Sequence, residues 1–284
     1  MYRKIIKFFL PQIIVKLLNK FNNNNVWGYT GIYENMSSAR SNATGYEADN
    51  IVQKVLTATQ QVIDGKACYE RDSVVFYKKE HNYSLVSCLY RIAMENNGEV
   101  HVLDFGGALG SSFWQNKDIL QGVIKNFSWH IVEQDSFFNA SKMLKYDAPL
   151  YFHKTIDDAL DSEPGINVVL LSSVLQYLDD PESILKQFEN IDYIIIDRAP
   201  EFIDRTSAVF SVQYVKEPIY DGSYALRIWG KDELKKLLLK NCCLLDEWIS
   251  EIDGVQSFKL QDGSCAQIHD CGMFFKRSFY QKEN

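Results

Sequence analysis

The sequence predicts an α/β fold in which helices cover both faces of a mostly parallel sheet. Five short apolar segments alternate with amphipathic ones between residues 99 and 198, and this alternation is typical of parallel sheets. The segment Val168–Leu171 is apolar at every position, as expected for a strand that is buried on both faces. A glycine-rich turn at Gly106–Gly110 directly follows the first apolar segment.

The predicted elements follow in a regular order. Strands are expected at 100–105, 128–134, 150–154, 166–173 and 193–198. Helices are expected between and after them, at 111–123, 135–146, 155–162, 180–190 and 231–241. Asp180 is the predicted N-cap of its helix, with Pro181 in the first turn. Two more strands, 244–250 and 271–278, have no helix between them and are expected to pair as an antiparallel hairpin.

The N-terminal third differs from this pattern. Residues 46–64 and 84–98 have helical spacing, whereas 73–79 is ambiguous between a strand and a helical turn. We expect a basic amphipathic helix and linker at 1–25, a helical lid or substrate segment at 26–98, and a cofactor-binding domain at 99–284. Basic residues and a proline interrupt the apolar run of this first helix. The segment is therefore expected to be neither a secretory signal nor a membrane span. It either lies on an anionic membrane surface or packs on protein.

Composition limits the classes of function. The formal net charge of −7 argues against a general nucleic-acid binder. The six cysteines include no C-x-x-C pair, so we interpret them as reduced thiols of a cytosolic protein. The short run of Cys265, His269 and Cys271 lacks the second ligand pair of a structural zinc site, and no metal is predicted.

The turn after the first strand indicates a nucleotide-like ligand. A dinucleotide site has the order G-x-G-x-x-G and binds pyrophosphate, whereas here Gly106, Gly107 and Gly110 give G-G-x-x-G. Asp104 stands just before the glycines, where a carboxylate disfavours a diphosphate but attracts the ammonium and sulfonium of S-adenosylmethionine. The alternative role for Asp104 is that of a helix cap. Phe105 completes the turn.

Polar residues after two other strands extend this site. Glu133, followed by Gln134, ends the second strand and is placed to bind the ribose hydroxyls of an adenosine. Ser172, Ser173 and Gln176 follow the fourth strand, at the edge where open α/β sheets bind ligands. We predict that all five contact the methyl donor, although the last segment could instead be a polar helix start.

Several of these motifs together resemble a known family. The stretches "YERDSVVF", "VLDFGGALGSSF", "IVEQ", "SSVLQYLDDP" and "IIIDRAP" are similar to those of a bacterial family of class I S-adenosylmethionine-dependent methyltransferases. Its genes typically lie among those for surface polysaccharides such as O-antigen or capsule. The resemblance covers about Trp27 to Phe275. It implies a Rossmann-like sheet of seven strands, S-adenosylmethionine as cofactor, and a sugar or lipid-linked glycan as acceptor.

Candidates for the chemistry lie on loops of the sheet edge. A sugar hydroxyl loses a proton on methylation, and the candidate bases are Asp197, His153 and Glu70. Each has a structural alternative: a buried Asp–Arg pair, a surface histidine and a helix start, respectively. The candidate acceptor-binding residues are aromatic or charged: Arg71, Tyr177, Arg198, Tyr220, Asp221 and Tyr224.

The predicted function is O-methylation of a sugar, in the cytoplasm or at the inner face of the membrane. The alternatives are an NAD-dependent sugar oxidoreductase or epimerase, and a methyltransferase fold that serves as a scaffold without catalysis. Asp104 and the glycine order count against the oxidoreductase, as argued above. The final hairpin also counts against it, because dinucleotide folds have an all-parallel sheet.

Overall fold

The structure is a computed structural model that describes residues 28–45, 49–216, 219, 222–250, 254–260 and 262–278. Two of the sequence predictions fall outside the described residues. They are the basic N-terminal helix expected at 1–25 and the acceptor-binding candidates Tyr220 and Asp221.

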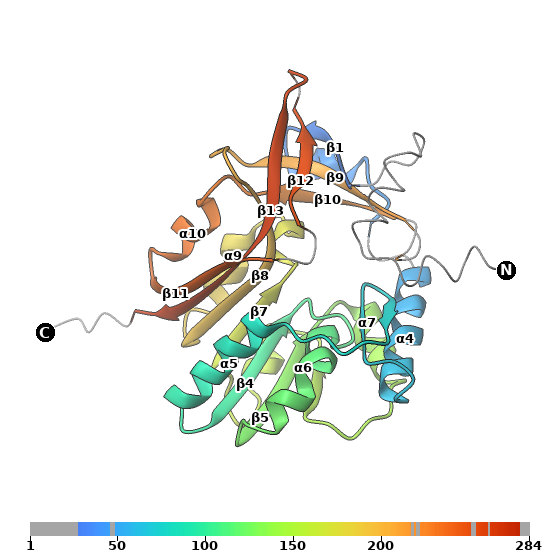
Figure 1. Cartoon of the computed structure of the whole chain (residues 1–284), viewed down its shortest axis with the longest axis vertical. Helices are drawn as coiled ribbons and strands as arrows, with labels where there is room; N and C mark the ends of the chain where they lie inside the picture. The colour runs from blue at the N-terminus through green and yellow to red at the C-terminus, as the bar shows by residue number, and fades with distance from the viewer. Residues whose placement is uncertain are drawn as a thin grey trace, which may run out of the picture.

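The core of the molecule is an eight-stranded sheet, which confirms the predicted α/β class (Figure 1). Along its main path the order is β6-β5-β4-β7-β8-β13-β11, and β12 pairs with β13. The pairs from β6 to β8 are parallel, whereas β13 is antiparallel to both β8 and β11. The predicted C-terminal hairpin is therefore present. The bounds are β4 Glu99–Phe105, β5 Asn126–Val132, β6 Leu150–His153, β7 Val168–Ser172, β8 Tyr193–Phe202, β11 Cys242–Ile249, β12 Gln256–Lys259 and β13 Cys265–Arg277.

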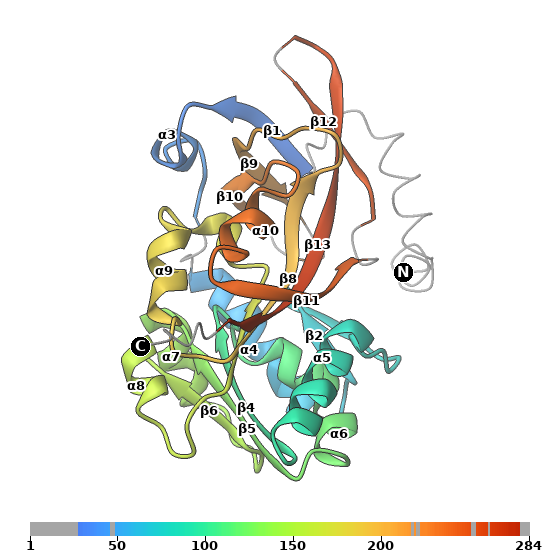
Figure 2. The ribbon, with the colours of Figure 1, turned by 90° about the vertical axis from the view of Figure 1, so that its left-hand side faces the viewer.

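Helices cover the sheet on both faces (Figure 2). One face packs on α5 and α6 around Trp129, and the other packs on α8, α9 and α10 around Phe188. Local signals set several helix starts: the Asp180 side chain caps α9 as predicted, and Thr155 caps α8. The bounds are α4 Asp49–Ile63, α5 Tyr83–Glu95, α6 Ser111–Gln121, α7 Asp135–Ser141, α8 Ile156–Leu160, α9 Pro181–Gln187 and α10 Glu233–Leu238.

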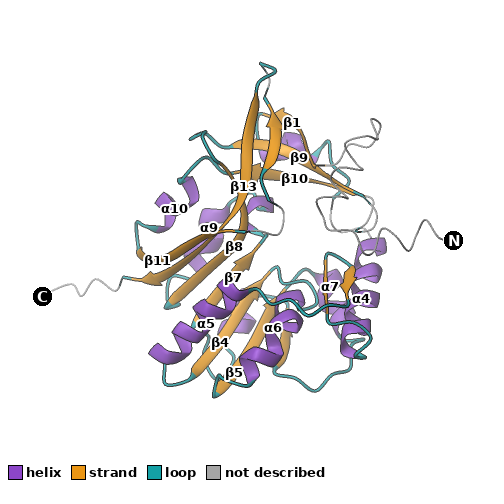
Figure 3. Ribbon diagram, viewed as in Figure 1, coloured by secondary structure: helices purple, strands orange, loops and turns teal. Residues whose placement is uncertain are grey.

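A second, three-stranded sheet lies above the first (Figure 3). It is antiparallel, in the order β1-β9-β10, and joins β1 (Gly28–Tyr33) to β9 (Val209–Val215) and β10 (Gly222–Ile228). The short helix α3 (Met36–Arg40) packs on β9 and β10 through Met36 and Ala39. No strand was predicted from the sequence at 209–215 or 222–228, where β9 and β10 lie. The N-terminal segment therefore contributes a strand as well as helices.

The ambiguous segment at 73–79 contains a short strand, not a helical turn. β2 (Tyr69–Arg71) and β3 (Val74–Phe76) form a hairpin whose two turn residues, Asp72 and Ser73, have φ of 50° and 67°. Two successive residues with positive φ match the right-handed twist of a tight hairpin. The hairpin packs on α4 and on α6.

A bulge in the main sheet marks the carboxyl edge. The register of β8 against β13 shifts where Asp197 and Arg198 oppose Gly272. A Cβ on Gly272 would lie 2.0 Å from the ring of Trp248, so glycine is required there. β-bulges bend a strand and often re-aim a side chain beside a functional site. Beyond the bulge, β8 continues to Phe202 beneath the small sheet and pairs with Trp229 through Glu201.

Candidate functional site

The glycine turn lies at the centre of the main sheet's carboxyl edge. It follows β4, whose neighbours are β5 and β7, so the chain order reverses at this point and ligands bind in such crevices. Gly106 and Gly110 have φ of 75° and 93°, which glycine adopts without strain. A Cβ on Gly106 would lie 2.6 Å from Cγ2 of Val174. The turn therefore packs directly on the loop that follows β7.

Asp104 points at this turn from below. It is 1% exposed, and Trp129 Nε1 donates a hydrogen bond of 3.0 Å to its Oδ2. Its Oδ1 has no hydrogen-bond partner among the described residues. An added Cβ on Gly107 would lie 2.5 Å from the carboxyl carbon. Burial raises the pKa of Asp104 to about 7, and among the described residues neither of its oxygens accepts a hydrogen bond from a cationic side chain.

Glu133 reaches the same turn from the end of β5. The backbone N–H of Ala108 donates to its Oε1 at 3.0 Å, and that of Gln134 donates to its Oε2 at 2.8 Å. Burial raises the pKa of the Glu133 carboxyl above its ordinary value. The Gln134 side chain itself is exposed. Phe105 packs edge-on to Phe188, with ring centroids 6.1 Å apart, on the face of the sheet that α9 covers.

Glu70 is the third carboxylate on the turn. It is 1% exposed, accepts a hydrogen bond from Ser111 Oγ at the start of α6, and accepts another from the Ser73 N–H at 3.2 Å. Burial raises its pKa to about 7. Its neighbour Arg71 points elsewhere, with its guanidinium over the rings of Tyr69 and Phe76. Three carboxylates thus border residues 107–111.

Asp197 connects three elements at the bulge. Its Oδ2 accepts from Asn82 Nδ2 at 3.0 Å and from Ser172 Oγ at 3.3 Å, and Arg198 Nε lies 3.9 Å away. Asn82 is also the N-cap of α5, because its Oδ1 accepts from the Leu85 N–H. These contacts give Asp197 a clear structural role, in addition to its predicted role in catalysis.

His153 lies at the other side of the sheet, on β6. Its Nε2 is 3.0 Å from Nδ1 of His130, which in turn contacts Ser128 Oγ, and this hydroxyl contacts His101. Burial lowers the pKa of His153, and it lowers that of His130 to about 4. Two strands, β5 and β4, lie between β6 and β7 in the sheet, and His153 does not line the pocket described next.

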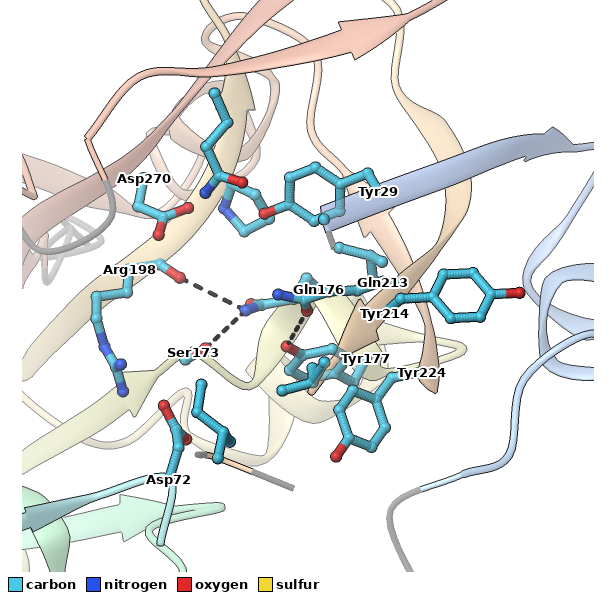
Figure 4. A pocket seen from close by; sticks show the side chains of 16 residues that line it. Tyr29, Asp72, Ser173, Gln176, Tyr177, Arg198, Gln213, Tyr214, Tyr224 and Asp270 are labelled. Carbon is cyan, nitrogen blue, oxygen red and sulfur yellow. Dashed lines mark hydrogen bonds between the residues drawn. The ribbon is translucent and has the colours of Figure 1, made fainter. Parts of the chain in front are cut away.

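A polar pocket lies between the carboxyl edge of the main sheet and the small sheet (Figure 4). Five residues singled out from the sequence line it: Ser173, Gln176, Tyr177, Arg198 and Tyr224. Sequence reasoning missed the other polar members. These are Tyr29 from β1, Asp72 from the β2–β3 turn, Gln213 and Tyr214 from β9, Gln256 from β12, and Asp270 from β13. The alternating pattern of "VFSVQYV" was a signal for β9, but nothing local indicated its partner β1.

Residues with positive φ concentrate around this pocket. Ser173 at the end of β7 has φ of 53°, Arg198 in the bulge has 54°, and Asp72 in the hairpin turn has 50°. Such conformations cost free energy in residues other than glycine, and they cluster where structure is shaped for ligands. Three lining residues from three segments share this feature, which supports a binding site here.

Other features of the chain bear on metals and membranes. Cys265 is exposed, Cys271 is buried with its Sγ donating to Ala199 O, and His269 Nε2 lies 3.6 Å from Glu201. Among the described residues no three metal-ligating side chains gather in one place. In the same part of the chain, no helix is both long and apolar enough to cross a bilayer.

Comparison with known proteins gives distant structural likenesses. No family model matches the chain, and no curated protein matches its sequence. The N-terminal domain of EvdMO1 with S-adenosylhomocysteine (SAH) bound is similar with a TM-score of 0.45 and 11% identity, over 82% of this chain and 98% of that one. The magnesium protoporphyrin IX methyltransferase ChlM from Synechocystis PCC 6803 with bound SAH gives 0.41 and 14%, over 82% and 90%.

A third solved structure is similar to the same degree. The N-methyltransferase NodS from Bradyrhizobium japonicum WM9 in complex with SAH gives a TM-score of 0.39 and 10% identity, over 78% of this chain and 98% of that one. Likenesses of this degree do not assign a function to the chain. The function proposed below is therefore inferred from the geometry of the site.

Proposed function

We propose that this protein is an S-adenosylmethionine-dependent methyltransferase. The observation that supports this most directly is the set of three carboxylates, Asp104, Glu133 and Glu70, around the glycine turn. Glu70 already bonds to the first residue of α6, at the helix end where a dinucleotide site would place its pyrophosphate. A diphosphate there would meet uncompensated negative charge, whereas a ligand with an ammonium and a sulfonium would neutralise it.

The donor site would be formed by the turn and its two flanking strands. Glu133 bonds to backbone N–H groups through one lone pair of each oxygen, which leaves acceptor capacity for ribose hydroxyls. Asp104 Oδ1 would receive a donor from the cationic end of the ligand. The residues proposed to bind the donor are Asp104, Phe105, Gly106, Gly107, Gly110, Glu133, Gln134 and Ser172. Ser173 and Gln176, which were also predicted from the sequence to bind the donor, line the pocket of Figure 4, and we propose that they bind the acceptor.

When bound, S-adenosylmethionine supplies a methyl group on a good leaving group. In the transfer, a C–O bond to the acceptor forms as the C–S bond breaks, and the hydroxyl proton passes to a protein base. Glu70 is the best placed of the three candidate bases, because it lies at the turn, two residues from Asp72 of the pocket. A carboxyl with a pKa near 7 is suited to accept a proton at neutral pH.

The acceptor in this proposal is a sugar hydroxyl of a surface polysaccharide or of its lipid-linked precursor. The family resemblance supports this class, and so does a pocket lined by tyrosines, amides and carboxylates. The protein would work in the cytoplasm, with residues 1–21 holding it at the inner membrane surface. Deletion of these residues should release the protein from anionic vesicles while donor binding stays intact.

Calorimetry of the purified full chain with S-adenosylmethionine, SAH and NAD tests the proposal. We expect the first two to bind and NAD not to bind, and Asp104→Asn to weaken S-adenosylmethionine more than SAH, which lacks the sulfonium charge. Binding of NAD without binding of S-adenosylmethionine would instead support the oxidoreductase. Donor binding without transfer to any glycan fraction would favour a scaffold.

A further inference from the structure

We infer that the pocket of Figure 4 binds the acceptor as an uncharged, hydroxyl-rich ring and discriminates against anionic sugars. This inference rests on the proposed function, because it assigns the acceptor subsite of the same reaction. It goes further in naming the charge class of the acceptor and the groups that select it.

Gln176 favours a ligand that donates hydrogen bonds. Its side chain is 3% exposed, and its Nε2 donates to Ser173 Oγ at 2.9 Å and to the Arg198 carbonyl at 3.5 Å. A carbonyl oxygen can only accept, so this contact sets which end of the amide is nitrogen. The opposite atom, Oε1, is buried and has no partner among the described residues. An unpaired buried acceptor is costly, and a ligand hydroxyl would satisfy it.

The charges around the pocket disfavour an anion. Asp72 and Asp270 line the pocket from opposite sides, and Arg198 is the only cationic side chain among its described lining residues (Figure 4). The Arg198 Nε lies 3.9 Å from the Asp197 carboxylate, which offsets its charge. A phosphate or uronate in this pocket would face more negative than positive charge. A neutral ring with several hydroxyls could donate to these carboxylates.

The aromatic walls suit the faces of a sugar ring. Tyr177 donates from its hydroxyl to Gln213 Oε1 at 3.0 Å, and its ring lies edge-on to Tyr224 at a centroid distance of 6.1 Å. These contacts hold the Tyr177 ring in place before any ligand arrives. Tyr29 extends from β1 toward the side of the pocket that bears Asp270 (Figure 4). Rigid aromatic side chains provide apolar contact at low entropic cost.

The pocket also adjoins the proposed donor site on two sides. Ser173 of the pocket precedes Val174, whose methyl group packs on Gly106 of the turn. Asp72 of the pocket belongs to the hairpin that carries Glu70, and the N–H of Ser73 bonds to Glu70. An acceptor in the pocket would therefore lie beside both the donor turn and the proposed base.

Paired monosaccharides test the inference on the full chain saturated with SAH. The probes are methyl glucopyranoside against methyl glucuronide, and methyl galactopyranoside against methyl galacturonide, so each pair differs only at C6. Saturation-transfer NMR titrations should give at least one neutral glycoside that binds at least tenfold more tightly than its uronide. Equal or tighter binding of the uronides would overturn the inference, as would the failure of all neutral probes to bind while SAH is bound.

Two variants assign the selectivity to named groups. Asp72→Asn, which keeps a residue that tolerates positive φ, should narrow the neutral-to-anionic ratio at least twofold, whereas Asp147→Asn at an exposed site outside the pocket should not. Gln176→Met should weaken the neutral glycoside about tenfold. If Gln176→Met weakens SAH instead of the glycoside, the residue belongs to the donor site and the inference fails. Glycoside binding to a protein that binds no SAH would defeat the proposed function but not the pocket's charge class.

Discussion

Substitution of Gly107 by alanine probes the contact between the glycine turn and Asp104. The new Cβ would lie 2.5 Å from the Asp104 carboxyl carbon and from Oδ2, whereas carbon atoms pack at about 3.5–4.0 Å. A shift of about 1 Å is therefore required. Gly107 does not have positive φ, so the effect comes from this clash and not from backbone strain.

The clash has two measurable consequences. Overpacking of a closely packed site costs about 1–3 kcal/mol, and each kcal/mol lowers the melting temperature of a domain of this size by about 2–4 °C. A displaced Asp104 also loses its hydrogen bond from Trp129, and its carboxylate no longer faces the proposed donor site. We expect SAH affinity to fall roughly ten- to a hundredfold, which corresponds to about 1.4–2.8 kcal/mol.

Gly165→Ala is the matched control. Gly165 is exposed, and an added Cβ would meet nothing within 4 Å, so the free energy of unfolding should stay within about 1 kcal/mol of the wild type. Thermal melts and calorimetric titration with SAH would compare both variants with the parent. If Gly107→Ala binds SAH with wild-type affinity, Asp104 and its turn do not form the donor site.

Three further predictions follow from buried carboxylates and helix caps. Because the pKa of Asp104 is raised to about 7, the folded protein holds a proton that the unfolded chain releases near pH 4. The stability of the apo protein should therefore fall as pH rises from about 4 to 7, and the affinity for S-adenosylmethionine should rise. Asp104→Asn should reduce both trends in thermal melts and titrations, and the part of the stability trend that comes from Glu70, whose pKa is also raised to about 7, should stay. Glu70→Gln should lower the methyl-transfer rate about a hundredfold or more in a radiolabel assay and remove the inflection of the rate near pH 7; an unchanged pH profile would exclude Glu70 as the base. Asn82→Ala should lower the free energy of unfolding, measured by urea denaturation, by about 2–4 kcal/mol, because it removes both a helix cap and a hydrogen-bond donor to buried Asp197. The control Asp180→Ala removes only an exposed helix cap and should cost about 1 kcal/mol. Equal losses in the two variants would refute a special role for the contact between Asn82 and Asp197.

The alternating core of the fold was predictable because its signals are local. The apolar strands at the centre of the sheet and the cap at Asp180 all depend on residues within a few positions of one another. Boundaries were less accurate where tertiary contacts extend an element. β8 runs to Phe202 because it pairs with β13 beyond the bulge, and β13 starts at Cys265 because its first residues pair with β12.

The candidate site divides in the same way. The glycine turn and the preceding Asp104 could be recognised from the sequence because a turn of this shape restricts its own residues. The structure places the Asp104 carboxylate against Gly107 of the turn. The predicted base His153 lies at the carboxyl end of a parallel strand, as expected from the sequence. Its contact with His130 could not be predicted, because it depends on which strand lies next to β6. No local pattern indicated that Asp270 and Tyr29 would share a pocket.

The order of residues along the chain thus determined the α/β class and the glycine turn with its carboxylate, because both arise from backbone sterics and short-range periodicity. Tertiary structure decided which distant groups meet. It placed Glu70 against Ser111, and it paired β1 with β9 across about 180 residues to close the pocket. Such contacts depend on the packing of complete surfaces, and a polar strand such as β1 contributes to them without a signal in its own sequence.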